Sequence, residues 1–238
     1  MFWRNGKRTF ADSGIFCGFT DCHCHILPGV DDGVETMEES LAILSQYEQL
    51  GICNVWLTPH IMEDVPNTTA ALKQRFTELK EAYSGSITLH LSAENMLDSV
   101  FRERFHDGDL LPWGNGGDRL LAETSYYEPP ANFRHVLKEI KSRGFFPVLA
   151  HPERYLYMKP SDYETLKKQG VELQLNLFSL IGMYGRRAKD KAEFILNEGL
   201  YDYAATDLHA IGTLQSAMQE KLNTKIIAKV LQIGKQHL

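Results

Sequence analysis

The chain has 238 residues, 43% of them hydrophobic and 24% charged, with a formal net charge of −6. We expect one domain over residues 1–238, and a single α/β barrel often has this size. The acidic balance and the lack of a basic block argue against a nucleic acid as the main partner.

The expected location follows from features that the sequence lacks. The N-terminal segment MFWRNGKRTF has no long apolar core of the kind found in signal peptides. No apolar run reaches the roughly 18 residues that a membrane span needs. The four cysteines lie in the first quarter of the chain and cannot crosslink the rest of it. We therefore expect a cytoplasmic protein with reduced cysteines and no transmembrane segment.

Short apolar runs alternate with amphipathic stretches along the chain. Each run is bounded by turn residues and predicts a buried strand. The predicted strands are residues 15–19, 54–57, 87–91, 120–122, 146–150, 171–175 and 203–205. The segments between them predict helices, which are residues 37–50, 68 or 69 to 83, 131–143, 161–169 and 186–198. The first helix opens on the capping box Thr36-Met37-Glu38-Glu39, and most of the helices end directly before a glycine.

The repeated order of helix, glycine and strand predicts βα units and a parallel sheet. Seven strands without a domain break favour a closed or nearly closed barrel of the α/β class. An open doubly wound sheet is the competing architecture. The GxGxxG fingerprint that such a sheet often carries is missing, and the glycine-rich stretch at 114–117 predicts a loop.

Histidine and carboxylate residues follow six of the seven predicted strands. They are His23, His25, His60, Glu94, Glu123, His151, Asp207 and His209. The carboxyl ends of all strands in a βα barrel meet at one rim, so these side chains are expected to converge there. One histidine at a strand end is more often an ordinary polar residue, but six strand ends together indicate a metal centre. Imidazole and carboxylate ligands suit Mn, Fe, Zn or Ni better than Mg or Ca.

The spacing of the first cluster supports this interpretation. Side chains alternate along a strand, so His23 and His25 are expected to face one side while Cys22 and Cys24 face the other. The DxH pair near the C-terminus has the same spacing. The alternation argues against a Cys/His zinc knuckle and indicates a structural role for the cysteines.

Several neighbouring residues leave two interpretations open. Asp32 either completes a metal site or forms an Asp-Gly turn. Arg154 either binds phosphate with its fork of N–H donors or forms a surface salt bridge. Glu153 is ambiguous, with a surface acid as one interpretation. The aromatic residues of the same rim loops either line a pocket for an aromatic substrate or pack the loops; they are Tyr126, Tyr127, Tyr155, Tyr157 and Phe178.

The ordered motifs DCHCH, TPH, SAEN, AHPERY and TDLH, with Glu123 between the third and fourth, resemble the polymerase and histidinol phosphatase (PHP) superfamily. Together with LPGVDDG and TMEESL, they are most similar to the PHP-type protein tyrosine phosphatases of bacterial capsule and exopolysaccharide loci. The resemblance extends over residues 19–209. It implies a distorted (β/α)7 barrel of the TIM-like kind with two or three divalent metal ions, often Mn.

The resemblance also implies individual roles at this site. It implies three ligand sets, which are His23, His25, Glu94 and Asp207; Glu94, Glu123 and His151; and Asp32, His60 and His209. Arg154 matches the phosphate-binding arginine of the HxER motif, and the expected catalytic residues are Arg154, Asp207 and His209. His209 is a candidate proton donor to the leaving oxygen. The implied reaction is hydrolysis of phosphotyrosine in a protein, typically the tail of a bacterial tyrosine kinase that controls polysaccharide export.

Two departures from the family pattern leave the substrate open. Some relatives carry basic residues after the DxH and TPH motifs, whereas this chain has Ala-Ile-Gly at 210–212 and Ile-Met-Glu at 61–63. The site is therefore expected to hold fewer phosphate-binding cations. The alternatives are a small-molecule phosphatase of the histidinol-phosphate type, a phosphodiesterase, and a non-catalytic protein that docks on a kinase.

Overall fold

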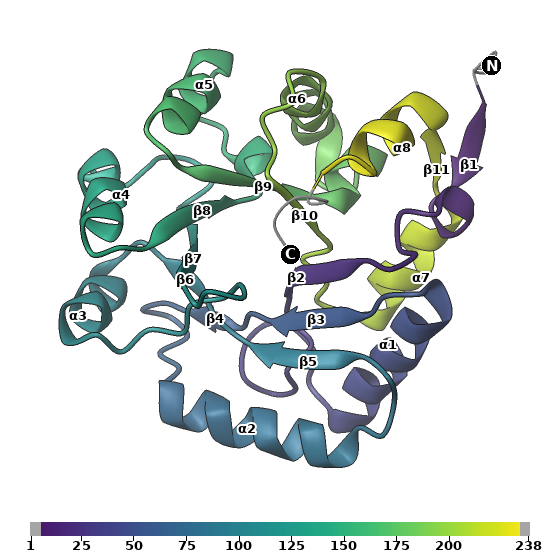
Figure 1. Cartoon of the computed structure of the whole chain (residues 1–238), viewed down its shortest axis with the longest axis horizontal. Coiled ribbons are helices and arrows are strands. Elements are labelled where there is room, and N and C mark those ends of the chain that lie inside the picture. Colours follow the sequence, from purple (N-terminus) through teal and green to yellow (C-terminus); the bar gives the residue numbers. More distant parts are fainter. Residues whose placement is uncertain (1–5, 234–238) are drawn as a thin grey trace.

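The computed structural model describes residues 6–233, so the first five residues of the N-terminal segment lie outside it. Its parallel strands lie inside a ring of helices, as Figure 1 shows. The strands are β2 (Thr20–Cys24), β3 (Asn54–Leu57), β4 (His60–Ile61), β5 (Thr88–Leu91), β6 (Glu94–Met96), β7 (Arg119–Glu123), β8 (Phe146–Ala150), β9 (Glu172–Asn176) and β10 (Tyr203–Ala205). They form a six-stranded sheet in the order β10-β9-β8-β7-β6-β4 and a three-stranded sheet in the order β2-β3-β5.

Two strands of the barrel are interrupted, so that each begins in the smaller sheet and continues in the larger one; each such continuous path is called a strand line. β3 is followed by β4 after an interruption at residues 58–59, and β5 is followed by β6 after an interruption at 92–93. The two lines stay hydrogen-bonded across the break, since the Ser92 amide donates to the Leu57 carbonyl at 2.8 Å. The two sheets therefore form one continuous wall.

The wall closes between β10 and β2. An isolated parallel bridge joins Cys24 to Leu208, and the Asp207 amide donates to the His23 carbonyl at 2.8 Å. Within residues 6–233 the wall thus contains seven parallel strand lines in chain order. This confirms the distorted (β/α)7 barrel, and the competing open sheet is wrong.

The helices occupy the segments between strands. They are α1 (Met37–Leu50), α2 (Thr69–Ala82), α3 (Ser99–Asp107), α4 (Phe133–Ser142), α5 (Pro160–Lys168), α6 (Gly185–Asn197), α7 (Ile211–Gln219) and α8 (Thr224–Val230). The five predicted helices match α1, α2, α4, α5 and α6 within two residues, and the Thr36 hydroxyl caps α1 by accepting from the Glu39 amide at 3.2 Å. The prediction missed α3, α7, α8 and the antiparallel pair β1 (Lys7–Thr9) and β11 (Lys221–Asn223). Among residues 6–233, no helix combines the length and apolarity that a membrane crossing requires.

The predicted strand at residues 15–19 is wrong. Ile15 and Phe16 are buried, but they belong to a turn between Gly14 and Gly18, whose φ angles are 77° and 70°. Positive φ values interrupt an extended strand, so these apolar side chains enter the core from a loop. The first barrel strand is instead the more polar Thr20–Cys24, which carries part of the candidate site within the strand itself.

The inside of the barrel is packed below the candidate site. Leu121 lies two residues before Glu123 on β7, so both side chains point to the same face of the strand. Leu121, Val148 and Ala205 belong to a buried apolar cluster separate from the main core between barrel and helices. This apolar layer supports the polar side chains at the carboxyl ends of the strands.

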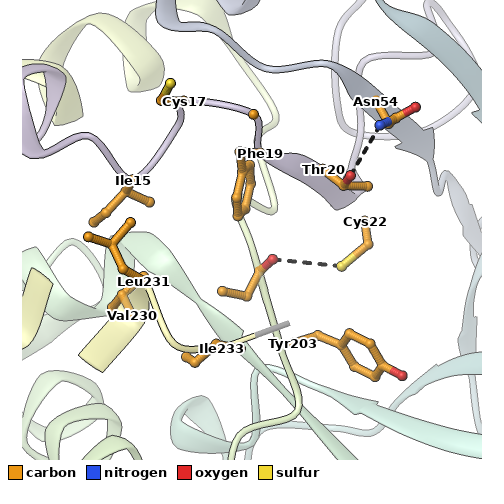
Figure 2. A pocket seen from close by; sticks show the side chains of 12 residues that line it. Ile15, Cys17, Phe19, Thr20, Cys22, Asn54, Tyr203, Val230, Leu231 and Ile233 are labelled. Carbon is orange, nitrogen blue, oxygen red and sulfur yellow. Dashed lines mark hydrogen bonds between the residues drawn. The ribbon is translucent and has the colours of Figure 1, made fainter. Parts of the chain in front are cut away.

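A pocket of about 390 Å³ lies at the opposite end of the barrel (Figure 2), beside the starts of β2, β3 and β10. Cys22 contacts it and donates its S–H to the Ala204 carbonyl at 3.7 Å. None of the described residues that line this pocket is a histidine or a carboxylate. The pocket is therefore separate from the candidate metal centre.

Candidate metal centre

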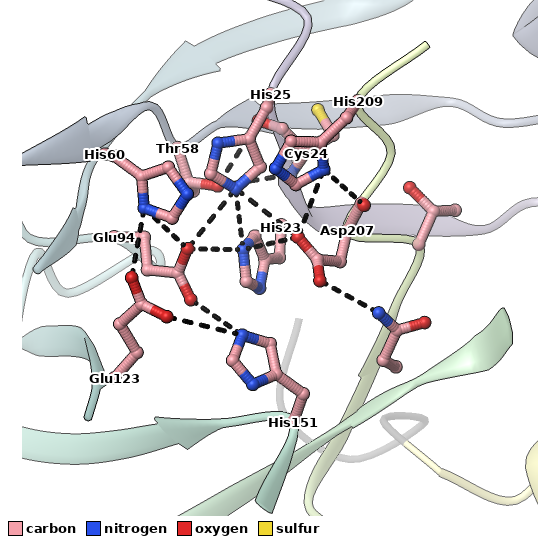
Figure 3. A network of polar contacts seen from close by, with 12 residues as sticks. His23, Cys24, His25, Thr58, His60, Glu94, Glu123, His151, Asp207 and His209 are labelled. Carbon is pink, nitrogen blue, oxygen red and sulfur yellow. Dashed lines mark hydrogen bonds and ion pairs between the residues drawn. The ribbon is translucent and has the colours of Figure 1, made fainter. Parts of the chain in front are cut away.

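Figure 3 shows imidazole and carboxylate groups from different strands pointing toward one another at the rim of the barrel. The structure brings together all nine residues predicted as metal ligands. Seven of them are buried, namely His23, His25, His60, Glu94, Glu123, His151 and Asp207. The His209 side chain is 30% exposed and the Asp32 side chain 69% exposed. The cluster is thus deep at its centre and open to solvent on one side.

The deep group consists of His23, His25, Glu94 and Asp207, whose ligand atoms all lie within 4.8 Å of one another. His23 Nε2 lies 3.0 Å from His25 Nε2 and 3.2 Å from Glu94 Oε2. It also lies 3.3 Å from Asp207 Oδ1. Two ring nitrogens and two carboxylate oxygens therefore surround one point.

Two further side chains orient the imidazoles of the deep group. His23 Nδ1 lies 2.7 Å from Gln174 Oε1, and His25 Nδ1 lies 2.8 Å from Asp31 Oδ2. An amide oxygen and a carboxylate only accept hydrogen bonds, so each Nδ1 carries the proton and each Nε2 can direct a lone pair at the group's centre. Neither partner was predicted from the sequence, because Gln174 lies within a predicted strand and Asp31 only neighbours the predicted ligand Asp32.

Hydrogen bonds also orient the side chain of Asp207. Its Oδ2 accepts hydrogen bonds from Arg154 Nη1 at 2.7 Å and from Asn176 Nδ2 at 2.9 Å. Its Oδ1 faces His23 without such a bond. Burial raises the pKa of Asp207, but the charges of His23 and His151 and the contact with His25 together hold the pKa well below its usual range. Asn176, a poor metal ligand by its chemistry, instead orients a candidate ligand.

The lateral group consists of His60, Glu94 and Glu123. His60 Nδ1 lies 3.2 Å from Glu94 Oε2 and 3.1 Å from Glu123 Oε1. His151 faces the same two carboxylates, with its Nε2 3.0 Å from Glu94 Oε1 and 3.9 Å from Glu123 Oε2. Both histidines are therefore placed to share an ion with Glu94 and Glu123.

The outer group consists of His25, Asp32, His60 and His209. Asp32 Oδ1 lies 3.4 Å from His60 Nε2 and 3.6 Å from His209 Nε2. The rings of His25 and His209 stack with their centroids 4.0 Å apart. His60 therefore faces the outer group with one nitrogen and the lateral group with the other.

The cysteines do not follow the predicted alternation strictly. His23 and His25 converge as expected, but a register shift lies between Asp21 and Cys24 on β2. The Gln174 amide donates to Cys22 Sγ at 3.4 Å while its oxygen contacts His23. Cys22 thus packs inside the barrel below the site instead of facing away from it.

Backbone strain is concentrated at two candidate ligands. His151 has a φ of 34° and Asp207 a φ of 51°, and within residues 6–233 no other non-glycine residue has a positive φ. Such conformations cost on the order of 1–3 kcal/mol each and persist where the surroundings enforce them. The strain supports a functional origin for the placement of these two side chains.

The buried polar atoms of the cluster fit divalent cations. In the described part of the chain, seven buried side-chain N or O atoms lack a hydrogen-bond partner, and five of them lie here. The five are His60 Nδ1, Glu94 Oε2, Glu123 Oε1, His151 Nδ1 and Asp207 Oδ1. Unpaired buried polar atoms are costly, and mixed nitrogen and oxygen donors suit transition-metal ions.

The pKa values describe the same cluster without metal ions. Burial lowers the pKa of His23, but the charges of Glu94 and Asp207 outweigh it and raise the pKa to about 9. At neutral pH a metal ion that binds Nε2 of this ring must therefore displace one proton.

Arg154 lies beside the deep group and does not form a surface salt bridge. Its side chain is 17% exposed and pairs with the buried Asp207. The guanidinium lies over the rings of Tyr126 and Tyr184, at 4.5 Å and 4.1 Å from their centroids. Only one of its five N–H donors is needed for Asp207, so others can face an anion at the metal centre.

Glu153 is not a surface acid. It is buried, and it accepts hydrogen bonds from the Asn176 amide at 3.0 Å, from Ser179 Oγ at 2.8 Å and from the Tyr201 hydroxyl at 2.9 Å. Burial raises the pKa of Glu153 above its ordinary value. It joins the segment that carries Arg154 to the end of β9.

Replacing Glu153 with alanine is expected to lower the free energy of unfolding by about 3 kcal/mol, because three donors lose their buried acceptor and each orphaned group costs ~1–3 kcal/mol. Denaturant unfolding monitored by circular dichroism measures this change. Glu38→Ala, at the exposed start of α1, is the control and should stay within about 0.5 kcal/mol of the unaltered protein. An equally small change for Glu153→Ala would contradict the anchoring role.

Some of the aromatic residues in the rim loops pack the loops, whereas others line a pocket. Tyr155 and Phe178 are fully buried, and Tyr157 stacks on Tyr155 with centroids 5.6 Å apart, so these three pack the loops. Tyr126 and Tyr127 instead line a pocket of about 230 Å³ beside Arg154.

The seven-stranded βα barrel and the histidines and carboxylates at its strand ends agree with the resemblance to the PHP superfamily. The family model described as "Capsular polysaccharide synthesis, CpsB/CapC" matches residues 19–233, and the chain belongs to this family.

Individual relatives agree with the family match. The chain is 28% identical over 208 residues to the tyrosine-protein phosphatase YwqE of Bacillus subtilis, covering 85% of this chain and 82% of YwqE. It is 26% identical over 228 residues to the tyrosine-protein phosphatase CpsB of Streptococcus pneumoniae, covering 88% and 89%. The crystal structures of these two proteins, described as unique metal-dependent tyrosine phosphatases, include a chain with the same fold. It matches with a TM-score of 0.75 and 24% identity, over 92% of this chain and 89% of that one.

Proposed function

We propose that this protein is a metal-dependent phosphoesterase that hydrolyses phosphotyrosine in a protein substrate. The observation that carries the proposal is the convergence of nine imidazole and carboxylate groups beside a partly buried arginine. Relatives named tyrosine-protein phosphatases, which cover most of the chain, support the choice of substrate.

We assign the ligands to two or three divalent ions, with Mn²⁺ as the expected ion. One ion would be held by the deep group, one by Glu94, Glu123 and His151 with His60 nearby, and a third, where present, by Asp32, His60 and His209. Ions of this kind polarise phosphoryl oxygens and lower the pKa of water, which supplies a nucleophile near neutral pH.

The chain's own residues position the phosphoryl group. Arg154 directs its remaining donors toward a phosphate at the rim and offsets the negative charge that develops there. The Tyr126 and Tyr184 rings both contact its guanidinium group and help to orient it.

His209 suits a ligand role better than that of proton donor. Its Nδ1 donates to the Asp207 carbonyl at 2.9 Å, which leaves Nε2 facing Asp32. Burial and the nearby His25 lower the pKa of His209, so its ring is neutral at pH 7.

The physiological substrate in this proposal is the phosphorylated tail of a bacterial tyrosine kinase in the cytoplasm. The link of the family to capsular polysaccharide synthesis supports this choice.

Removing metal ions is expected to abolish turnover of phosphotyrosine peptides and of para-nitrophenyl phosphate, and Mn²⁺ readdition should restore it. The measurement is the rate before chelation, after chelation and after readdition, with metal content by mass spectrometry. Turnover that survives complete metal removal would contradict the proposal.

A substrate panel separates the alternatives. Strong preference for histidinol phosphate or a nucleotide would replace the tyrosine phosphatase assignment. Binding of a kinase tail by a protein purified without metal and without turnover would favour the non-catalytic docking protein.

A further inference from the structure

The pocket of about 230 Å³ beside Arg154 is assembled from three segments. The loop after β7 contributes Tyr126 and Tyr127, the segment after β8 contributes Arg154 and Leu156, and the start of α6 contributes Tyr184, Arg187 and Ala188. Its wall continues that of the metal centre, because Tyr126 contacts both the His151 ring, with centroids 5.9 Å apart, and the Arg154 guanidinium.

Hydrogen bonds join these three segments. The Leu156 amide donates to the Tyr126 carbonyl at 2.7 Å, and Arg187 Nη2 donates to the Leu156 carbonyl at 2.7 Å. The pocket therefore has bonded walls and is not a chance gap between loops. Tyr127, which is 77% exposed, stands at its solvent side.

The charges around the pocket are unbalanced. Among the described residues no carboxylate lies within 4.0 Å of the Arg187 guanidinium or of the Lys191 amine, whereas Arg154 is paired with Asp207. Burial and the nearby Arg187 lower the pKa of Lys191 to about 8, as expected for neighbouring cations. Glu153 also lines the pocket, but its carboxylate oxygens are committed to the donors that anchor it.

Arg187 is placed to bind an anion beyond the phosphate. Its bond to the Leu156 carbonyl uses one N–H, and an arginine fork has five. Successive residues of an extended peptide are about 3.3 Å apart, so a side chain within two residues of a phosphotyrosine can reach from the rim into this pocket. A carboxylate matches the geometry and charge of the guanidinium fork.

We propose that this pocket is a subsite for an aspartate or glutamate that flanks the phosphotyrosine of the substrate, with Arg187 as the residue that sets this preference. The proposal rests on the phosphotyrosine-protein function proposed above. In such a subsite, Arg187 of α6 takes the place of the basic residues that are absent after the TPH and DxH motifs.

The test compares three phosphotyrosine peptides that differ only at the residues beside the phosphotyrosine, which are glutamate, glutamine or lysine. The metal-loaded protein is expected to have a kcat/KM roughly two- to fivefold higher for the glutamate peptide than for the glutamine peptide, the range of a solvent-accessible ion pair. The lysine peptide should be the poorest substrate. The preference should shrink as the salt concentration rises.

Arg187→Gln keeps an N–H donor but loses the charge, and it should remove the preference. Arg187→Glu should reverse it, so that the lysine peptide becomes the better substrate. Arg186→Glu is the matched control, since Arg186 is the adjacent exposed arginine of α6, pairs with Asp190 at 3.6 Å and does not line the pocket. It should leave the preference unchanged.

The outcomes separate this proposal from the function on which it rests. If the unaltered, metal-loaded protein hydrolyses none of the peptides, the proposed function fails. If it hydrolyses them with equal kcat/KM, or if Arg187→Glu keeps the original order, the subsite fails while the function stands. An equal loss for the three peptides and para-nitrophenyl phosphate in Arg187→Glu would also overturn it, because para-nitrophenyl phosphate has no flanking residue.

Discussion

Replacing Glu94 with glutamine is expected to lower kcat/KM for phosphotyrosine peptides more than about a hundredfold, since losing a partner that merely orients a ligand already costs ~10–100-fold. Glu94 belongs to both the deep and the lateral group. Its Oε2 lies 3.2 Å from His23 and 3.3 Å from His25. Glutamine keeps the size of the side chain but removes its negative charge and places an amide among the metal-binding atoms.

The accompanying measurement is the metal-to-protein ratio, with circular dichroism to show that the variant folds. Glu172→Gln is the matched control. Glu172 begins β9, at the opposite end of the barrel, where its Oε2 accepts from Arg119 and Tyr203 at 3.1 Å each. The control should keep its metal and its turnover. A Glu94→Gln protein with unchanged metal content and turnover would show that Glu94 is not a ligand.

The fold was predictable where the strands are mostly apolar. Residues 54–57, 146–150 and 203–205 match β3, β8 and β10 residue for residue, because strands covered on both faces need continuous apolar side chains. The first strand of the barrel does not follow this rule and was not predicted. β2 contains Asp21, which is buried because its carboxylate accepts from the Thr206 amide at 2.9 Å. A partner 185 residues away leaves no local signal in the sequence.

The candidate ligands were predictable from the sequence, whereas the residues that orient them were not. In a parallel barrel the strand ends converge, so chain order alone places His60 and His151 at one rim. Gln174 has no such signal, because it lies two residues before the end of β9 and contacts His23 across 151 residues of sequence. Glu153 looked like a surface acid because charged residues are mostly exposed, and only its three buried donors make its burial favourable.

Replacing Arg154 with alanine is expected to lower kcat/KM for para-nitrophenyl phosphate by about 10²–10³, the loss typical of one preorganised donor to a developing negative charge. Arg154→Lys should recover little of this activity. An ammonium group has neither the planar fork that binds two phosphate oxygens nor the flat face that packs on Tyr126 and Tyr184. The inhibition constant for inorganic phosphate should rise in both variants.

Metal content distinguishes the two roles that the structure permits for this arginine. Arg154 contacts Asp207 Oδ2, and Asn176 holds the same oxygen at 2.9 Å. Because that second bond remains, Asp207 should stay oriented in Arg154→Ala, and the metal-to-protein ratio should match that of the unaltered protein. A loss of metal as large as the loss of turnover would mean that Arg154 acts by positioning Asp207. Full activity in Arg154→Lys would mean that positive charge alone is enough, and the rings of Tyr126 and Tyr184 would then have no part in orienting the phosphate-binding group.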